Sequence, residues 1–132
     1  MPFVLDASIV ACWAFQDKDH ARADLAFARI RTDEAIVPSL WWFEVRNLLV
    51  VNERRKRLTE LDTDNFLRQI SRLVLRIDRA PDEADVLRLA RTRRLTVYDA
   101  SYLELAQRES VPLATLDAHL ARAARAESVL LI

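Results

Sequence analysis

The chain has 132 residues, of which 52% are hydrophobic and 30% are charged, and its twenty basic side chains balance its twenty acidic ones. This composition is typical of one globular domain with a buried core, and it excludes a disordered or fibrous protein. A net charge of zero argues against a protein that coats nucleic acid by bulk attraction, although it leaves room for a local basic track.

Some residue types are rare or absent, and this excludes several kinds of site. Glycine does not occur, which excludes the phosphate-binding P-loop, the dinucleotide-binding fingerprint and the glycine-flanked serine elbow. A backbone position with positive φ must then fall to asparagine, aspartate or another residue with a Cβ atom, at some strain. Cys12 is the only cysteine, and His20 and His119 lie far apart, so neither an internal disulfide nor a cysteine-based zinc site is expected.

Nothing in the sequence predicts a membrane or secreted protein. No apolar run approaches the roughly 18–20 residues that span a bilayer. The first residues reach Asp6 without passing through a basic region, unlike a secretory signal peptide. We therefore expect a cytoplasmic protein.

The first part of the chain alternates predicted strands with predicted helices. The apolar runs 3–5 and 35–37 predict strands, the second of which ends at Pro38. Helices are predicted over residues 17–31 and from a cap at Ser39 to about residue 55, because apolar residues recur every three or four positions. The apolar faces of these helices are formed by Ala23, Ala26, Phe27 and Ile30 in the first and by Trp41, Val45, Leu48 and Leu49 in the second.

The middle of the chain continues this alternation. Thr59 followed by Asp62 resembles a capping box at the start of a helix. The segment 75–77 is predicted to leave this helix as a third strand, and Pro81 suits the first turn of another helix that runs to about Arg93. The apolar face of the helix after Thr59 comprises Phe66, Ile70, Leu73 and Val74.

The last part of the chain predicts three more strands. Residues 95–97 (Leu-Thr-Val) predict a fourth strand, and a helix is predicted to begin at Asp99. Residues 112–115 predict a fifth strand, which is followed by a helix from Asp117. The apolar residues 129–132 predict a final strand.

Short apolar strands separated by helices predict a parallel sheet that is covered on both faces. We expect an α/β fold, namely a three-layer α/β/α sandwich with a mainly parallel central sheet. Ligands in such folds bind beyond the carboxyl ends of the strands. The residues that follow each strand are therefore the first candidates for a functional site.

Three aspartates follow predicted strands in equivalent ways. Asp6 comes directly after its strand, while Asp99 and Asp117 each come one residue later. Aspartate is a favoured helix N-cap, and capping alone would explain each residue separately. On parallel strands, however, the three carboxylates would meet at one edge of the sheet, where their repulsion would destabilise the fold unless a cation or a proton intervened.

Glu44 is a fourth acidic residue in an unusual setting. Its helical neighbours are Leu40, Trp41 and Leu48, and Asn47 lies on the same side of the predicted helix. A carboxylate among large apolar groups is costly unless it is paired or bound to a metal. The alternative to a metal site is a salt bridge between Glu44 and an arginine at the margin of the core.

A cluster made only of oxygen donors suits a hard cation such as Mg²⁺ or Mn²⁺ rather than zinc. Such a cation polarises a phosphodiester, lowers the pKa of bound water and stabilises the leaving oxygen. It also cancels the repulsion between an acidic pocket and a polyanionic substrate. An acidic site is thus compatible with RNA as the substrate.

Four segments together closely resemble PIN-domain proteins, and most of all the VapC-type toxins of bacterial toxin–antitoxin pairs. These segments are Val4–Ser8 (VLDAS), Pro38–Asn47 (PSLWWFEVRN), Thr96–Ala106 (TVYDASYLELA) and Leu113–Asp117 (LATLD). The resemblance spans nearly the whole chain. It implies that residues 1–132 form a single PIN-like nuclease domain with the activity of a metal-dependent endoribonuclease.

The resemblance also implies roles for particular residues. Ser8 and Thr115 match small hydroxyl positions beside the first and last acids, and Asn47 matches a polar position after the glutamate; all three would orient carboxylates or water. The implied partners are RNA, a cognate small antitoxin and a second copy of the chain. The catalytic, metal-binding acids of the family match Asp6, Glu44, Asp99 and Asp117.

This sequence departs from the family pattern at two places where glycine is common. One precedes the predicted strand 95–97, where the chain reads Arg93-Arg94-Leu95. The other precedes the predicted strand 112–115, where it reads Glu109-Ser110-Val111. The departures leave the four acids intact and affect the geometry of the two loops.

Other readings of the same residues stay open. The basic run at residues 54–57 would either guide an RNA backbone or stabilise a helix end through the helix dipole. Trp42 would contact a second copy of the chain if it faces away from Trp41. Two other functions compete with the nuclease, namely a phosphoacceptor receiver-like domain, for which Lys18 and Lys56 are wrongly placed, and a non-catalytic module that binds a partner.

Overall fold

The computed structural model describes residues 1–15 and 20–132, and within them the chain forms four strands and seven helices. The strands pair in the order β3-β2-β1-β4, and every pairing is parallel. Val4 in the central strand pairs with Ile36 on one side and with Leu113 on the other. The strand bounds are β1 Phe3–Leu5, β2 Ala35–Pro38, β3 Leu75–Asp78 and β4 Leu113–Ala114.

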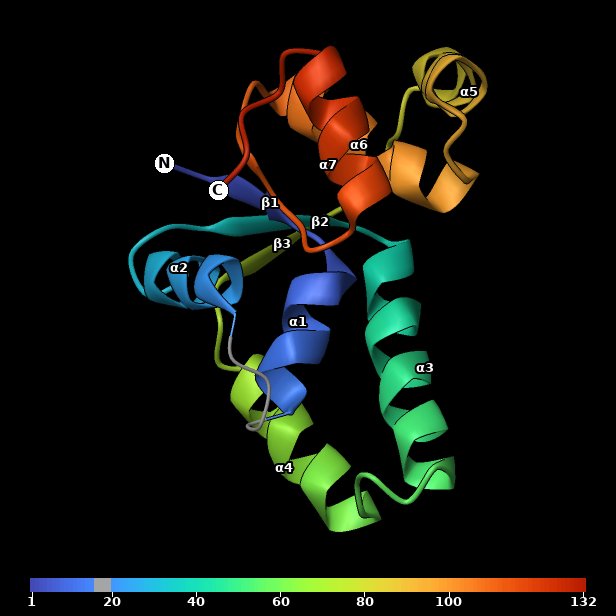
Figure 1. Cartoon of the computed structure of the whole chain (residues 1–132). Coiled ribbons are helices and arrows are strands. Elements are labelled where there is room, and N and C mark those ends of the chain that lie inside the picture. Colours follow the sequence, from blue (N-terminus) through green and yellow to red (C-terminus); the bar gives the residue numbers. More distant parts are fainter. Residues whose placement is uncertain (16–19) are drawn as a thin grey trace.

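Helices cover both faces of this sheet, which confirms the predicted three-layer α/β/α sandwich. In Figure 1, α5, α6 and α7 lie on one side of the sheet, and α1 to α4 lie on the other. The helix bounds are α1 Ala7–Ala14, α2 Ala21–Arg29, α3 Leu40–Arg54, α4 Glu60–Ile70, α5 Glu83–Arg93, α6 Val97–Glu109 and α7 Ala118–Ala126. Residues 17–19 of the first predicted helix lie outside the described residues.

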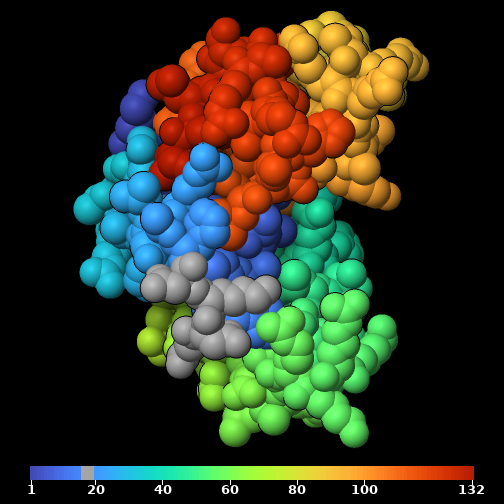
Figure 2. Space-filling model, viewed as in Figure 1, coloured from blue at the N-terminus to red at the C-terminus, as the bar shows by residue number. Residues whose placement is uncertain are grey.

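Helices α3 and α4 form a hairpin that extends away from the sheet (Figure 1). The space-filling view shows the green residues of this hairpin at the bottom, below the orange and red C-terminal residues (Figure 2). Part of α3 therefore lies beyond the sheet, so that its side chains border open space as well as the core. None of the described helices is long and apolar enough to cross a membrane.

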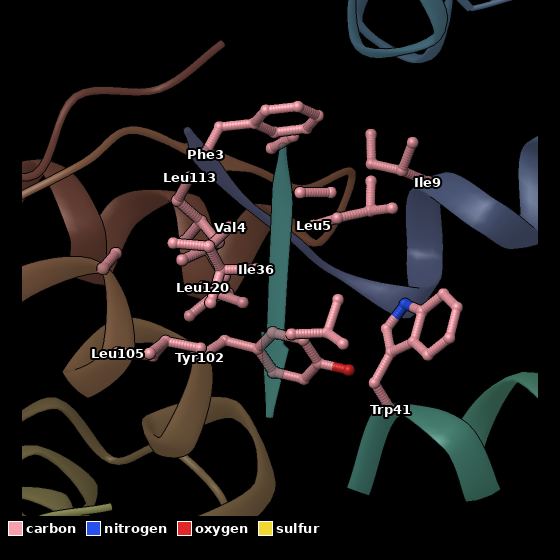
Figure 3. Close-up of a cluster of buried hydrophobic side chains, with 14 of the residues drawn as sticks. Phe3, Val4, Leu5, Ile9, Ile36, Trp41, Tyr102, Leu105, Leu113 and Leu120 are labelled. Atoms are coloured by element: carbon pink, nitrogen blue, oxygen red, sulfur yellow. The ribbon is translucent and has the colours of Figure 1, made fainter. Parts of the chain in front are cut away.

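The core is centred on β1, whose three residues are fully buried. Successive strand residues point to opposite faces of a sheet, and Figure 3 shows this alternation directly. Val4 lies toward Leu120 of α7, whereas Leu5 lies toward Ile9 of α1. Each fully buried side chain of this size contributes about 1.5–3 kcal/mol to stability, so the acid that follows β1 is attached to a well-anchored strand.

The predicted strand at residues 95–97 is wrong. Thr96 is instead the N-cap of α6, and its hydroxyl accepts a hydrogen bond from the Asp99 amide at 3.1 Å. Helix α6 accordingly begins at Val97, two residues before the predicted start at Asp99. A threonine that satisfies a free helix amide stabilises a helix start, and here this local contact prevails over the β propensity of the run.

Two other predicted strands are shorter in the structure. Of residues 112–115, only Leu113 and Ala114 belong to β4. The last segment, 129–132, forms a single parallel bridge between Leu131 and Leu113 rather than a strand.

The predicted helix starts are partly confirmed. Thr59 and Asp62 form the predicted capping box, with hydrogen bonds of 2.9 and 3.0 Å. Ser39 occupies the N-cap of α3, but its side chain makes no capping hydrogen bond. Asp82 caps α5, so Pro81 precedes this helix instead of lying in its first turn. Val74 lies beyond the end of α4 and is exposed, so it does not belong to the apolar face.

Because the chain has no glycine, residues with a Cβ atom adopt the left-handed backbone conformation at the ends of several helices. Arg94 ends α5 at φ 53°, and Ser110 ends α6 at φ 55°. These are the two segments where the sequence departs from the glycines of the family pattern. The helices close there as glycine would close them, at a cost of roughly 1–2 kcal/mol for each residue. Lys56 and Ser128 also have positive φ values.

Candidate active site

The four candidate acids come from separate parts of the chain and line one pocket of about 440 Å³. Asp6 follows β1, and Asp117 follows β4 as the N-cap of α7. Glu44 lies on α3, which follows β2. Asp99 lies in the first turn of α6, so a helix start rather than a strand end delivers it. The carboxyl edge of the parallel sheet thus collects all four side chains, as expected for a ligand site in this architecture.

Asp6 is the most buried of the four, with only 5% of the residue exposed. Its Oδ2 atom accepts hydrogen bonds from the Ser8 hydroxyl at 2.6 Å and from the Thr115 hydroxyl at 2.7 Å. These two hydroxyls accept hydrogen bonds in turn from the amides of Leu116 and Asp117. The network ties the ends of β1 and β4 together and fixes the orientation of the Asp6 carboxylate.

Glu44 is held by a residue that the sequence reasoning did not single out. The Tyr102 hydroxyl donates a hydrogen bond to Glu44 Oε1 at 2.5 Å. Tyr102 is fully buried in the core, and Figure 3 shows its hydroxyl directed toward the α3 side of the cluster. Its position three residues after Asp99, on the same helix, was the available signal. The alternative considered for Glu44, a salt bridge with an arginine, is not present among the described residues.

The other two acids are less enclosed. Asp117 uses Oδ1 to accept a hydrogen bond from the Leu120 amide at 2.8 Å, so it caps α7 and lines the pocket at the same time. The carboxylate of Asp99 is half-buried and has no hydrogen-bond donor among the described residues. His119 is exposed, and its Nε2 atom lies 3.1 Å from the carbonyl oxygen of Arg93.

The acids repel one another in this pocket. Burial raises the pKa of Asp6, Glu44 and Asp99, and neighbouring carboxylates raise each of these pKa values further. Hydrogen bonds from the hydroxyl donors oppose the shift at Asp6 and Glu44. Burial and the nearby acids also raise the pKa of Tyr102, so its hydroxyl keeps its proton and remains a donor to Glu44.

The pocket suits a hard cation through its donor chemistry, although the described side chains form no closed cage. No lysine or arginine among residues 1–15 and 20–132 forms an ion pair with the four acids. Within the same residues, no group of three acids, histidines or cysteines is arranged to hold an ion by itself. Mg²⁺ usually keeps several waters and uses only one or two carboxylates, so the open oxygen-lined pocket fits this ion.

The remaining predicted site residues lie at the same place. Ser8 and Asn47 line the pocket, and Thr115, which directly follows β4, contacts Asp6. Asn52 and Arg55 of the α3 region also line the pocket, and the sequence reasoning had not placed either of them there.

The chain is thus an α/β/α protein with acids gathered at the carboxyl edge of a parallel sheet. Comparison with known proteins identifies the family to which it belongs. The family model for the PIN domain matches residues 3–126, and the chain therefore belongs to the PIN-domain family. Ribonuclease VapC3 from Pyrobaculum aerophilum is 31% identical over 125 residues, which cover 92% of this chain and 93% of that protein. The resemblance to VapC-type proteins that the four motifs predicted is thus confirmed.

Solved structures agree with this assignment. PAE2754 from Pyrobaculum aerophilum superposes with a TM-score of 0.71 at 26% identity, over 93% of this chain and 87% of that one. VapC20 from Mycobacterium tuberculosis, described as a toxin that cleaves the sarcin-ricin loop, superposes with a TM-score of 0.62 at 13% identity. That match covers 92% of this chain and 94% of VapC20, and it supports the fold alone.

Proposed function

We propose that this protein is the toxin of a toxin–antitoxin pair and that it is a Mg²⁺-dependent endoribonuclease, with Mn²⁺ as an alternative ion. Membership of the PIN-domain family and similarity to a protein named as a ribonuclease support this function. The observation that carries the proposal is the meeting of Asp6, Glu44, Asp99 and Asp117 in one pocket, where no described lysine or arginine forms an ion pair with them. A fold retains such a costly arrangement where a cation compensates for the charge.

In this proposal the four acids hold the ion, and other residues hold the acids. Ser8 and Thr115 fix Asp6, while Tyr102 fixes Glu44. Bound Mg²⁺ would supply charge to polarise the phosphodiester and to activate water for hydrolysis. Asn47 lines the pocket beside Glu44 and would orient water or the phosphate. No histidine or lysine of the described residues lines this pocket, so the proposal assigns no side chain as general acid.

Cleavage of RNA by the purified chain, with and without Mg²⁺, tests the proposal. Asp6→Asn and Asp99→Asn should each lower the cleavage rate by a factor of about 10³ or more, in line with the loss of a major electrostatic contribution. The matched control is Asp64→Asn, because Asp64 is an exposed acid on α4 that does not line the pocket. Full activity of both pocket variants would contradict the proposed site.

The partners belong to the same proposal. We propose a cytoplasmic location, inhibition by a cognate small antitoxin, and a homodimer. Trp42 and Phe43 support a protein contact, since they are 46% and 68% exposed on α3 while Trp41 is buried. Light scattering on the wild type and on Trp42→Ala would test the dimer. Sequencing of RNA ends after brief induction, with Asp6→Asn as the control, would identify the target RNA.

A further inference from the structure

The pocket of the candidate site extends from the acids along one face of α3. Its α3 wall comprises Glu44, Asn47, Leu48, Val51, Asn52 and Arg55. These residues recur every three or four positions, which places them on one side of the helix. Arg55 follows Glu44 by eleven positions, and this corresponds to about 16 Å along the helix axis at ~1.5 Å per residue. We call this wall and the space beside it the α3 groove.

Arg55 gives the α3 groove one positive end. It is the only basic residue that lines the pocket among the described residues. The side chain is exposed, and within residues 1–15 and 20–132 it forms neither an ion pair nor a hydrogen bond. The guanidinium group is therefore available to a ligand, while the acids line the groove nearer the start of the helix.

The backbone at the end of α3 is capped without a hydrogen bond from the Arg55 side chain. Backbone amides satisfy three carbonyl groups of the last turn, since the Arg55 amide donates to Val51, the Lys56 amide to Glu53 and the Arg57 amide to Asn52. The left-handed conformation of Lys56, with φ 59°, closes the helix in this way. The side chain of Arg55 is thus not required as a donor to the helix end.

The four basic residues at the end of α3 are not equivalent. Arg57 stacks over the Phe15 ring at 4.5 Å and donates to Asn52 Oδ1 at 3.5 Å, so it has a structural role. Arg54 is exposed and lies outside the pocket. Among the described residues of this run, only Arg55 combines a side chain without an ion pair with a place on the wall of the active-site pocket.

We infer that the α3 groove binds the backbone of an RNA strand and that Arg55 holds a phosphate several nucleotides from the acids. This inference rests on the proposed function. A guanidinium group matches a phosphate in bidentate geometry, whereas the acids accept a phosphate only together with a cation. Leu48 and Val51 lie between the two ends and offer apolar surface to sugars and bases. At ~3.4 Å per stacked nucleotide, the groove spans about five nucleotides.

Binding of a labelled single-stranded RNA of about twelve nucleotides tests this inference. Fluorescence anisotropy would be measured with Mg²⁺ in an Asp99→Asn background, where the RNA stays intact. Adding Arg55→Ala should weaken binding about tenfold, the size expected for a hydrogen bond to a charged group. The slope of log affinity against log salt should decrease by about 0.7, corresponding to one phosphate contact. Arg55→Lys should restore much of the salt dependence because it keeps the charge.

Arg54→Ala is the matched control, since it removes the neighbouring charge from the same helix end. Its affinity should stay within about twofold of the parent, and a dinucleotide, too short to reach Arg55, should bind both variants equally. Equal losses for Arg54→Ala and Arg55→Ala, or no loss for either, would overturn the inference. Binding is measured separately from cleavage, so an affinity loss specific to Arg55→Ala, together with no RNA cleavage by the wild-type chain, would uphold the α3 groove and reject the nuclease function. RNA cleavage by the wild-type chain, together with unchanged RNA affinity of the Arg55→Ala variant, would uphold the nuclease function and reject the α3 groove.

Discussion

Among the described residues, carboxylates are buried in two places, and helix α6 contributes to both. In the acidic pocket, Asp6 is 5% exposed, and its side-chain donors are hydroxyl groups. On another side of α6, Glu104 is 2% exposed and accepts hydrogen bonds from Arg108 at 2.7 and 3.1 Å. The two carboxylates are similarly buried, but only Glu104 has a guanidinium partner.

The Glu104 region, which we call the arginine network, joins three elements. Arg108 donates both to Glu104 and, through two nitrogen atoms, to Asp78 at the end of β3, with distances of 3.1 and 2.8 Å. Glu104 also accepts the amide of Asp82, the N-cap of α5, at 3.0 Å. The network therefore anchors α6 against β3 and the start of α5, and α6 in turn carries Asp99 and Tyr102 into the pocket.

The acidic pocket and the arginine network differ in how burial affects their carboxylates, and we take the network as structural and the pocket as functional. In the arginine network, hydrogen bonds to Arg108 lower the pKa of Asp78, so the folded state favours the ionised form. In the acidic pocket, burial and mutual repulsion raise the pKa values of Glu44 and Asp99, so ionisation opposes folding. A buried acid that costs stability is a better candidate for function than one that contributes to it.

The largest effect on stability is expected from Arg108→Ala. This change leaves the buried Glu104 without its cation, and breaking a buried pair typically costs 3–5 kcal/mol. Because Arg108 is one-third exposed, water compensates in part, and we expect a loss of about 2–3 kcal/mol in the free energy of unfolding. Denaturant titration would measure it. The matched control, Arg91→Ala on α5, removes an exposed arginine that forms no ion pair with the described residues and should change little.

Replacing the acid as well as the arginine sharpens this test. In Arg108→Met with Glu104→Leu, the buried charge itself is gone, and much of the lost stability should return. A double variant as unstable as Arg108→Ala would show that the network does not act through the charge on Glu104.

Tyr102→Phe should have the largest effect on the pocket without removing an acid. It deletes the hydroxyl that donates to Glu44 at 2.5 Å while keeping the buried ring. A hydrogen bond to a charged group contributes about 1.5–3 kcal/mol, so we expect cleavage to fall about tenfold and Mn²⁺ to bind more weakly by calorimetry. Tyr98→Phe is the control, because Tyr98 is exposed on the same helix.

A double-variant cycle distinguishes positioning of Glu44 from a general effect on packing. In a Glu44→Gln background, the further change Tyr102→Phe should have little effect on Mn²⁺ binding. An undiminished effect in that background would show that Tyr102 does not act through Glu44.

Removing charge from the acidic pocket should stabilise the protein while it abolishes cleavage. Asp99→Asn removes a half-buried carboxylate whose pKa is raised by burial and by Asp6 and Asp117. Solvent screens part of this repulsion, so we expect Tm to rise by only about 2 °C at neutral pH without divalent ions. Added Mg²⁺ should raise the Tm of the wild type more than that of the variant. A lower Tm for Asp99→Asn would show that this carboxylate stabilises the fold.

Much of the fold and part of the site could be predicted from local signals in the sequence. The continuous apolar runs at 3–5 and 35–37 identify buried parallel strands, and Thr59 with Asp62 identifies a capping box. The position of Asp6 directly after such a strand was enough to place it at the carboxyl edge of the sheet.

The remainder depends on contacts between distant residues, which one sequence does not show. The segment 95–97 satisfies strand propensity and helix capping equally well, and only its surroundings decide between them. Glu104 and Arg108 have the spacing of a helix pair, but nothing local shows that Asp78 completes the network. For the same reason, the residue that positions Glu44 comes from a helix 58 positions away along the chain.

The pH dependence of stability should have opposite signs in the two regions. For Asp99, whose pKa in the folded state is raised above 3.8, ionisation costs stability at neutral pH, and this cost disappears as the pH falls through the folded pKa. The Tm advantage of Asp99→Asn over the wild type should therefore shrink between pH 7 and about pH 4. For Asp78, whose folded pKa lies below 3.8, the stabilisation is complete above that value and is lost only at lower pH.

The Tm penalty of Asp78→Asn should thus stay constant over the interval in which the advantage of Asp99→Asn disappears. Calorimetric melts in buffers free of divalent ions would measure both differences, with Asp64→Asn as an exposed acid that changes neither. Parallel pH curves for Asp78→Asn and Asp99→Asn would contradict the distinction between the two regions. Two curves that diverge as described would show that ionisation of the pocket acids opposes folding in the absence of a cation, because burial and repulsion between carboxylates both raise the pKa of Asp99 and are both relieved by protonation.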